Sequence, residues 1–224
     1  MTVHLPFLLL AILVLWLPRQ WLRLGSVFKR RRSSSAARAA QEPWNNREAG
    51  DPRLSLGTEF SKFRNYVDLI RAAGGSLAIG GGLGMPACLG VAEGAPHSMD
   101  YVVFGVRSLI LLVGLLIQTV RYEKKHLTFY PPIFYLAGLS VGLADPWAAL
   151  FAFALIWAFN AMLGNAQAFL TLYAIFVVVF GHYFAGKGDL SAIYAGILCF
   201  LPVLLSLMAN RPLVVFSRKG THKA

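Results

Sequence analysis

The chain has 224 residues, of which 57% are hydrophobic and only 14% are charged. Soluble domains carry about a quarter charged residues, so this composition excludes an ordinary soluble domain. The 21 Lys and Arg residues against 10 Asp and Glu residues give a net charge of +11. Next to so much apolar sequence, this charge favours a membrane protein over a nucleic-acid binder, and we expect no nucleic-acid partner.

Seven apolar stretches approach the length of a membrane-spanning helix. A bilayer core about 30 Å thick requires roughly 20 apolar residues in a helix, because lipid offers the backbone no hydrogen-bond partners. The sequence therefore predicts an all-α fold, a polytopic transmembrane helix bundle with about seven membrane segments. These segments are residues 1–17, 72–92, 101–120, 129–144, 147–163, 166–184 and 190–208.

Two of the seven segments have weaker signals than the others. Segment 72–92 contains seven glycines and Pro86, which lower its helix propensity. Segment 129–144 is short and begins at Pro131 and Pro132, residues suited to a first helical turn. It either crosses fully or forms a re-entrant pair with segment 147–163.

The distribution of basic residues predicts the orientation. If all seven segments cross with the amino terminus outside, every loop Lys and Arg except Lys187 faces the cytoplasm, and Arg107 lies within a span. Cytoplasmic loops are enriched in Lys and Arg, so we expect a multi-pass protein of the cytoplasmic (inner) membrane with its carboxyl terminus inside. The same rule requires segment 72–92 to cross, because otherwise one large group of cations would lie outside.

The regions between and around the spans complete the predicted organisation. The bundle has six segments in residues 72–208 and follows an amino-terminal membrane anchor in residues 1–24. Residues 25–58 form a basic, flexible cytoplasmic linker, residues 59–71 an interfacial amphipathic helix, and residues 209–224 a basic cytoplasmic tail. In the linker, four consecutive cations are expected to lie among anionic lipid headgroups: Lys29, Arg30, Arg31 and Arg32.

The expected interfacial helix, residues 59–71, has an apolar stripe at helical spacing. We expect this stripe to lie on the membrane surface, at the level of the headgroups, and the polar residues to face away from it. The alternative is that the stripe packs against the cytoplasmic domain of a partner. The stripe contains Phe60, Phe63, Val67 and Ile70, and the polar face contains Ser61, Asn65 and Asp68.

Four polar residues near the outer ends of the spans are candidate ligand-binding residues. Arg107 lies about 9 Å below the outer interface, where it either snorkels or forms a packing salt bridge, or else binds an anionic group. Asp145 is a candidate counter-ion for it. His182 lies at a similar depth and is either an interfacial residue or a proton carrier. The sequence places Ser140 at the level of His182.

Ser140 lies within a Gly-x-Ser-x-Gly pattern formed with Gly138 and Gly142. The nucleophile elbow of serine hydrolases has this pattern, but it requires a preceding strand, which we do not expect in lipid. Gly138 and Gly142 are more simply explained as a small-residue ridge for helix packing. No second histidine occurs at metal-ligand spacing in any span, so we expect no metal, no cofactor and no catalytic residue.

The sequence is compatible with three classes of function. The leading one is a multi-pass integral membrane protein without a recognisable catalytic motif, acting as a scaffold or accessory subunit of a membrane complex. The alternatives are a small-solute or lipid transporter with an outward-facing anion contact at Arg107, and an outer-leaflet enzyme using Arg107, His182 and Ser140. Convergence of these side chains with Asp145 around a cavity would favour the alternatives.

Overall fold

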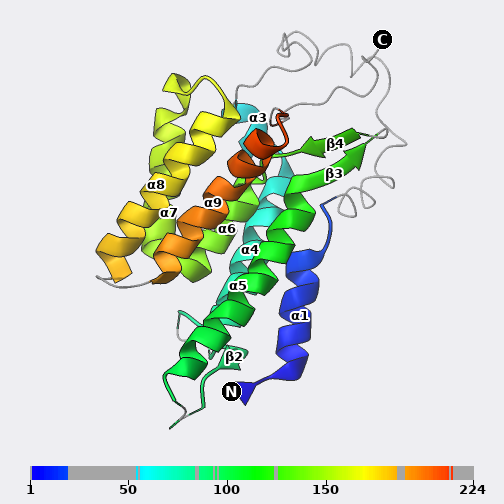
Figure 1. The fold of residues 1–224 in the computed structure, drawn as a ribbon. Coiled ribbons are helices and arrows are strands. Elements are labelled where there is room, and N and C mark those ends of the chain that lie inside the picture. The colour runs from blue at the N-terminus through cyan, green and yellow to red at the C-terminus, as the bar shows by residue number, and fades with distance from the viewer. Residues whose placement is uncertain are drawn as a thin grey trace.

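A computed structural model describes residues 2–19, 54, 56–83, 86–92, 94, 96–123, 126–185, 190–211 and 213. The predicted cations from Lys29 to Arg32, and most of the predicted linker and tail, lie outside these residues. The described chain is mostly helical, as the composition predicts. Its helices are α1 (Leu5–Trp16), α3 (Leu56–Phe60), α4 (Phe63–Gly80), α5 (Ser98–Thr119), α6 (Ile133–Leu143), α7 (Pro146–Phe159), α8 (Ala166–Ala185) and α9 (Leu190–Met208), with a 3-10 turn at Asn160–Met162 (Figure 1).

Three of the described helices, α5, α8 and α9, are long and apolar enough to cross a membrane. Helices α1, α6 and α7 are apolar but shorter. With 11 residues, α6 extends only about 17 Å, less than the hydrocarbon core of a bilayer. The fold is thus that of a membrane protein with three span-length helices, and the predicted seven full crossings are not established by helix length.

Helix α4 differs from the predicted division at residue 71. One continuous helix runs from Phe63 to Gly80 and joins the expected interfacial helix to the start of the second segment. It ends at Gly81, whose φ of 78° is in the left-handed region, and Leu83 also has a positive φ of 51°. Among the described residues from Gly81 to Ala92, the short strand β2 (Leu89–Gly90) is the one regular element.

The polar face of α4 points into the bundle instead of into water. Asn65 and Asp68 are 1% and 2% exposed, whereas Phe63 and Ile70 are 80% and 69% exposed. Ser61, before α4, is exposed, whereas Asn65 and Asp68 contact charged side chains within the bundle. The exposed side of α4 is apolar, as expected for a helix surface in contact with lipid.

Two short antiparallel strand pairs, which the sequence analysis did not predict, lie at opposite ends of the bundle (Figure 1). Strand β1 (Thr2–Val3) pairs with β2, and β3 (Val120–Glu123) pairs with β4 (His126–Phe129). Both pairs adjoin helix ends, where backbone groups lack partners within the helix and are satisfied by pairing.

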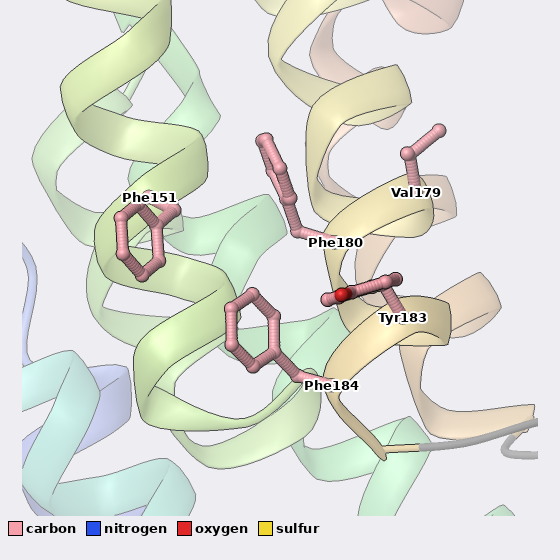
Figure 2. Close-up of a pocket in the computed structure, with 5 residues that line it drawn as sticks. All are labelled: Phe151, Val179, Phe180, Tyr183 and Phe184. Atoms are coloured by element: carbon pink, nitrogen blue, oxygen red, sulfur yellow. The ribbon is translucent and has the colours of Figure 1, made fainter.

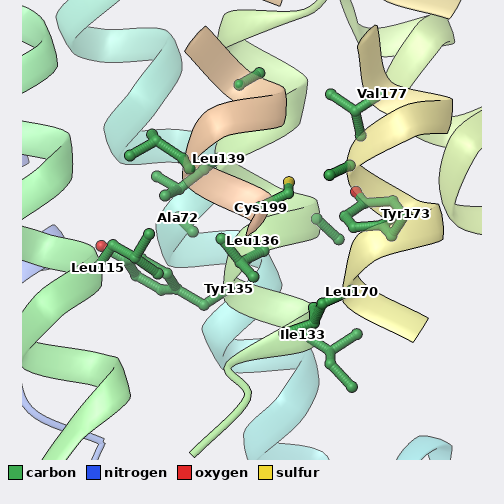
Figure 3. Close-up of a cluster of buried hydrophobic side chains, with 14 of the residues drawn as sticks. Ala72, Leu115, Ile133, Tyr135, Leu136, Leu139, Leu170, Tyr173, Val177 and Cys199 are labelled. Atoms are coloured by element: carbon green, nitrogen blue, oxygen red, sulfur yellow. The ribbon is translucent and has the colours of Figure 1, made fainter. Parts of the chain in front are cut away.

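Helix α6 is the centre of the core and packs against α4, α7 and α9. Its residues from Ile133 to Ser140 are all buried, and Tyr135, Leu136 and Leu139 are among the side chains drawn in Figure 3. Gly138 and Gly142 face α4 at close range. A Cβ atom at Gly138 would lie 2.7 Å from the Cβ of Ala72, and one at Gly142 would lie 2.6 Å from the carbonyl carbon of Ser76.

Candidate functional site

Arg107, the first of the four predicted site residues, binds the chain's own backbone. Its Nε donates a hydrogen bond of 3.0 Å to the carbonyl oxygen of Leu89 in β2, and its Nη2 donates to the same oxygen. Next to this contact, the amide of His4 donates to the carbonyl of Cys88 at 2.9 Å. Arg107 therefore helps to hold the strand pair β1–β2 on α5.

Ser140 is 1% exposed and lies in the core between α6, α8 and α9. Its Oγ donates to the carbonyl of Leu136 at 2.9 Å and lies 3.7 Å from the Sγ of Cys199. The hydroxyl of Tyr173 donates to Ser140 Oγ at 3.4 Å. This serine therefore links three helices and is not accessible to a substrate.

Asp145 and His182 also have separate surroundings. Asp145 caps the amino end of α7, accepting hydrogen bonds from the amides of Trp147 (2.8 Å) and Ala148 (3.4 Å). His182 is exposed near the end of α8. No hydrogen bond or ion pair joins any two of Arg107, Ser140, Asp145 and His182, all of which the structure describes. These contacts do not bring the four side chains together, and their role in ligand binding stays a prediction.

A different set of polar side chains does come together, between α1, α4 and α5. We call it the α1–α4 cluster, and its central residue is Asp68 of α4. One oxygen of the Asp68 carboxylate lies 2.9 Å from Arg19 Nε, and the other lies 2.8 Å from Arg71 Nη2. Two guanidinium groups thus share one buried carboxylate. The complete cluster consists of Arg19, Glu59, Lys62, Asn65, Asp68, Arg71 and Gln118.

Asn65 connects the central ion pairs to a second carboxylate. Its side-chain oxygen accepts a hydrogen bond from Arg19 Nη2. Its amide nitrogen donates to the carbonyl (2.7 Å) and to the carboxylate (2.9 Å) of Glu59. Glu59 in turn lies 2.5 Å from the ammonium group of Lys62. Glu59 of α3 is thus joined to Lys62 and Asn65, and these contacts stabilise the break between α3 and α4.

The cluster also satisfies the last carbonyl groups of α1, which have no partner within the helix. Arg71 Nη1 and Gln118 Nε2 both donate to the carbonyl of Leu17, the latter at 2.9 Å. The hydroxyl of Tyr135 donates to the carbonyl of Leu15 at 3.0 Å. A cation at this position also complements the negative end of the helix dipole. Through these contacts, α1 is fastened to α4, α5 and α6.

Arg19, which follows α1, is largely buried, and burial disfavours the charged form of its guanidinium group. Burial lowers the pKa of Arg19 to about 10, while the negative charge of Asp68 acts in the opposite direction. The positive charges of Arg64 and Arg121 lower the pKa further. Arg19 remains protonated at neutral pH, and the Asp68 carboxylate offsets part of its desolvation.

Part of this cluster was detectable in the sequence. Asp68 and Arg71 are three residues apart, the spacing at which side chains on one helix form ion pairs. The periodicity of residues 59–71 predicts Asp68 on the face opposite the apolar stripe but does not show that this face is buried. The contribution of Arg19 and Gln118 depends on distant segments, and no local pattern predicts it.

The pocket shown in Figure 2 is an apolar groove of about 300 Å³ between α7 and α8. Phe151 of α7 stacks on Phe184 of α8 with ring centroids 5.6 Å apart. The groove is open to the surroundings, since Tyr183 is 80% exposed. Its lining residues are Phe151, Val179, Phe180, Tyr183 and Phe184. Such a surface suits contact with hydrocarbon but provides no charged group for chemistry.

Among the described residues, no group of three His, Cys, Asp or Glu side chains could hold a metal ion. Comparison of the chain with protein families, curated proteins and solved structures finds no match. The described chain is that of a helical membrane protein in which the polar groups of the α1–α4 cluster bind one another and the backbone.

Proposed function

We propose that this chain is a non-catalytic, multi-pass protein of the cytoplasmic membrane, acting as a scaffold or accessory subunit of a membrane complex. In this proposal seven segments, α1 and α4 to α9, pass through the bilayer with the amino terminus outside and the carboxyl terminus inside. The supporting observation is the use of the buried polar groups: in the α1–α4 cluster they fasten helices together and do not line a cavity. Intramembrane polar residues with this use align helices.

The two alternatives have less support. A transporter that binds anions through Arg107 would have to release this side chain from the Leu89 carbonyl, to which two of its nitrogens donate. An enzyme using Ser140 and His182 would have to bring together a buried and an exposed side chain that have no contact. No observation on the described residues favours either alternative.

The proposal is tested by the size of the assembly in native membranes. We expect the protein, expressed at its natural level and extracted in mild detergent, to migrate on a native gel well above its 24.5 kDa monomer with bound detergent. A photo-crosslinking residue at exposed Tyr183 should yield a protein adduct, whereas one at buried Leu139 should not. Migration as a monomer without any adduct would contradict an accessory role.

A further inference from the structure

The exposed face of α1 is apolar, but it is short. Helix α1 has 12 residues and therefore extends about 18 Å, whereas the hydrocarbon core of a bilayer is about 30 Å thick. Its exposed side carries large apolar side chains that are each more than half exposed: Leu5, Phe7, Leu9, Leu10 and Leu13. If the chain passes through a membrane as proposed above, this face contacts hydrocarbon along about 18 Å.

One end of this face is bounded by polar backbone. Strand β1 directly precedes α1, and both of its residues are exposed. Within the described chain, β2 is the one neighbouring strand of β1, so the other edge of β1 is open. Backbone groups at an open strand edge require water or headgroups and do not occur next to lipid chains. The hydrocarbon therefore cannot extend along α1 beyond His4.

The other end of the face is bounded by the α1–α4 cluster. Arg19 lies three residues beyond the end of α1, and its side chain is 17% exposed. An arginine near the end of a short span can extend its side chain to distant headgroups. Arg19 is not free to do so, because its guanidinium group is bound to Asp68 and to Asn65. The hydrocarbon therefore ends near Leu17.

Helix α5 gives the same distance between these two ends. Arg107 donates to the carbonyl of Leu89 in β2, and Gln118 donates to the carbonyl of Leu17 after α1. Arg107 and Gln118 are 11 positions apart on α5, which corresponds to about 17 Å. Two layers of polar groups beside α1 are thus fixed at about this separation.

The other side of the bundle has the thickness of an ordinary bilayer. Helices α8 and α9 have 20 and 19 residues, which corresponds to about 30 Å each. Figure 1 shows α1 and α8 on opposite sides of the bundle. A span shorter than the bilayer is accommodated by thinning of the bilayer, by snorkelling of flanking side chains or by oligomerisation. The contacts of Arg19 and Arg107 argue against snorkelling.

We propose that the bilayer is locally thinned at α1, where lipid chains cover the apolar face between the β1–β2 pair and the α1–α4 cluster. The order of groups along this face is polar, apolar and polar, which is the order of headgroups, hydrocarbon and headgroups in a bilayer. The hydrocarbon is about 18 Å thick at α1 and about 30 Å thick at α8 and α9. This inference rests on the proposed passage of the chain through the membrane.

The test measures the depth of single nitroxide labels in the full-length protein, reconstituted in vesicles of dioleoylphosphatidylcholine. Electron paramagnetic resonance compares the collisions of each label with oxygen, which is enriched in hydrocarbon, and with a water-soluble nickel chelate. Cys88 and Cys199 are first replaced by alanine. The labels are attached to single cysteines at exposed positions, three on α1 and one on α8: Leu5→Cys, Leu10→Cys, Leu13→Cys and Ile175→Cys.

We expect the greatest depth on α1 at position 10, about 9 Å from the nearest polar layer, with positions 5 and 13 closer to one. Position 175, at the centre of α8, should be deeper, at about 15 Å. In a bilayer of full thickness at α1, the depth would instead change in one direction along the helix. Position 5 or position 13 would then be as deep as position 175, and this result would overturn the proposal.

The label at position 175 separates failure of this inference from failure of the proposed function. If the nickel chelate reaches position 175 as readily as position 5, the membrane passage is wrong, and this inference with it. If position 175 is deep but the labels on α1 are shielded from both oxygen and nickel, a second copy covers α1 and the thinning is wrong.

Longer lipid chains supply a second readout. In vesicles of dierucoylphosphatidylcholine, which form a thicker bilayer, the depth at position 175 should increase. The depth at position 10 should stay the same, because the two polar layers beside α1 are fixed by the protein. Equal increases at both positions would contradict the proposal.

Discussion

At the scale of single residues, Asp68 has the largest expected effect. It is 2% exposed and balances the charges of Arg19 and Arg71, which are themselves mostly buried. Removing one partner from a buried ionic group leaves the other charges without compensation, which typically costs 3–5 kcal/mol. The same carboxylate also positions the two arginines that contact α1.

We therefore predict that Asp68→Asn destabilises the protein by about 3 kcal/mol, measured as a lower melting temperature in mild detergent. The matched control is Asp100→Asn, because that carboxylate is exposed and its contact in the structure is His97 at 3.4 Å. The control should behave like the unmodified protein. Equal melting temperatures for the two variants would show that the buried ion pairs do not stabilise the fold.

A second prediction at this scale concerns Arg107. Because this partly buried side chain donates to the Leu89 carbonyl, Arg107→Gln should loosen the β1–β2 pair while costing only about 1 kcal/mol overall. Hydrogen exchange should become faster at the amide of His4, which donates to Cys88, and remain unchanged in α9. Unchanged exchange at His4 would mean that Arg107 does not hold this end of the chain.

Residue roles were only partly predictable from the sequence. Arg107 and Asp145 were expected near the outer end of the bundle, but their partners are backbone groups: the Leu89 carbonyl and the amides at the start of α7. Sequence spacing gives the depth of a side chain in a helix but not the direction in which it points. Backbone partners in very short strands, such as Leu89 of β2, leave no pattern in the sequence.

At the scale of elements, α4 and α6 form the most extensive contact between two described helices. Gly142 lies against Ser76, and Ser76 Oγ donates to the carbonyl of Gly138 at 3.3 Å. Helices in lipid gain little from the hydrophobic effect, so close approach at small residues is a principal source of their association. This makes the interface sensitive to single added methyl groups.

We predict that Gly142→Ala lowers stability by about 1–3 kcal/mol, because its Cβ would overlap the backbone of α4 at Ser76. The matched control is Gly74→Ala, also in a helix, where a Cβ meets nothing within 4 Å. It should be neutral or stabilising by up to about 1 kcal/mol, since alanine favours helices. Thermal unfolding of both variants in detergent measures the difference, and similar destabilisation by both would contradict this packing.

Some helices could be predicted from the sequence, whereas others and the short strands could not. The apolar runs that became α5, α8 and α9 were recognisable from length and hydropathy alone. Two features were not: α4, in which Asp68 and Arg71 interrupt the hydropathy of a continuous helix, and the short strands at the helix ends. Both depend on tertiary contacts, which supply partners that local composition does not reveal.

At the scale of the whole molecule, the proposed passage through a membrane places the two ends of the bundle on opposite sides of it. The β1–β2 pair is at one end, and α3 and the β3–β4 hairpin are at the other (Figure 1). The distribution of Lys and Arg predicts that the β3–β4 end faces the cytoplasm.

The most direct test is the accessibility of single cysteines in intact cells. His97→Cys and Tyr122→Cys are introduced separately after the buried residues Cys88 and Cys199 are replaced by alanine; His97 is fully exposed before α5, and Tyr122 is 72% exposed in β3. A membrane-impermeant maleimide should label position 97 in intact cells and position 122 only after permeabilisation. Labelling of both positions from the same side would contradict the proposed passage of the chain through the membrane.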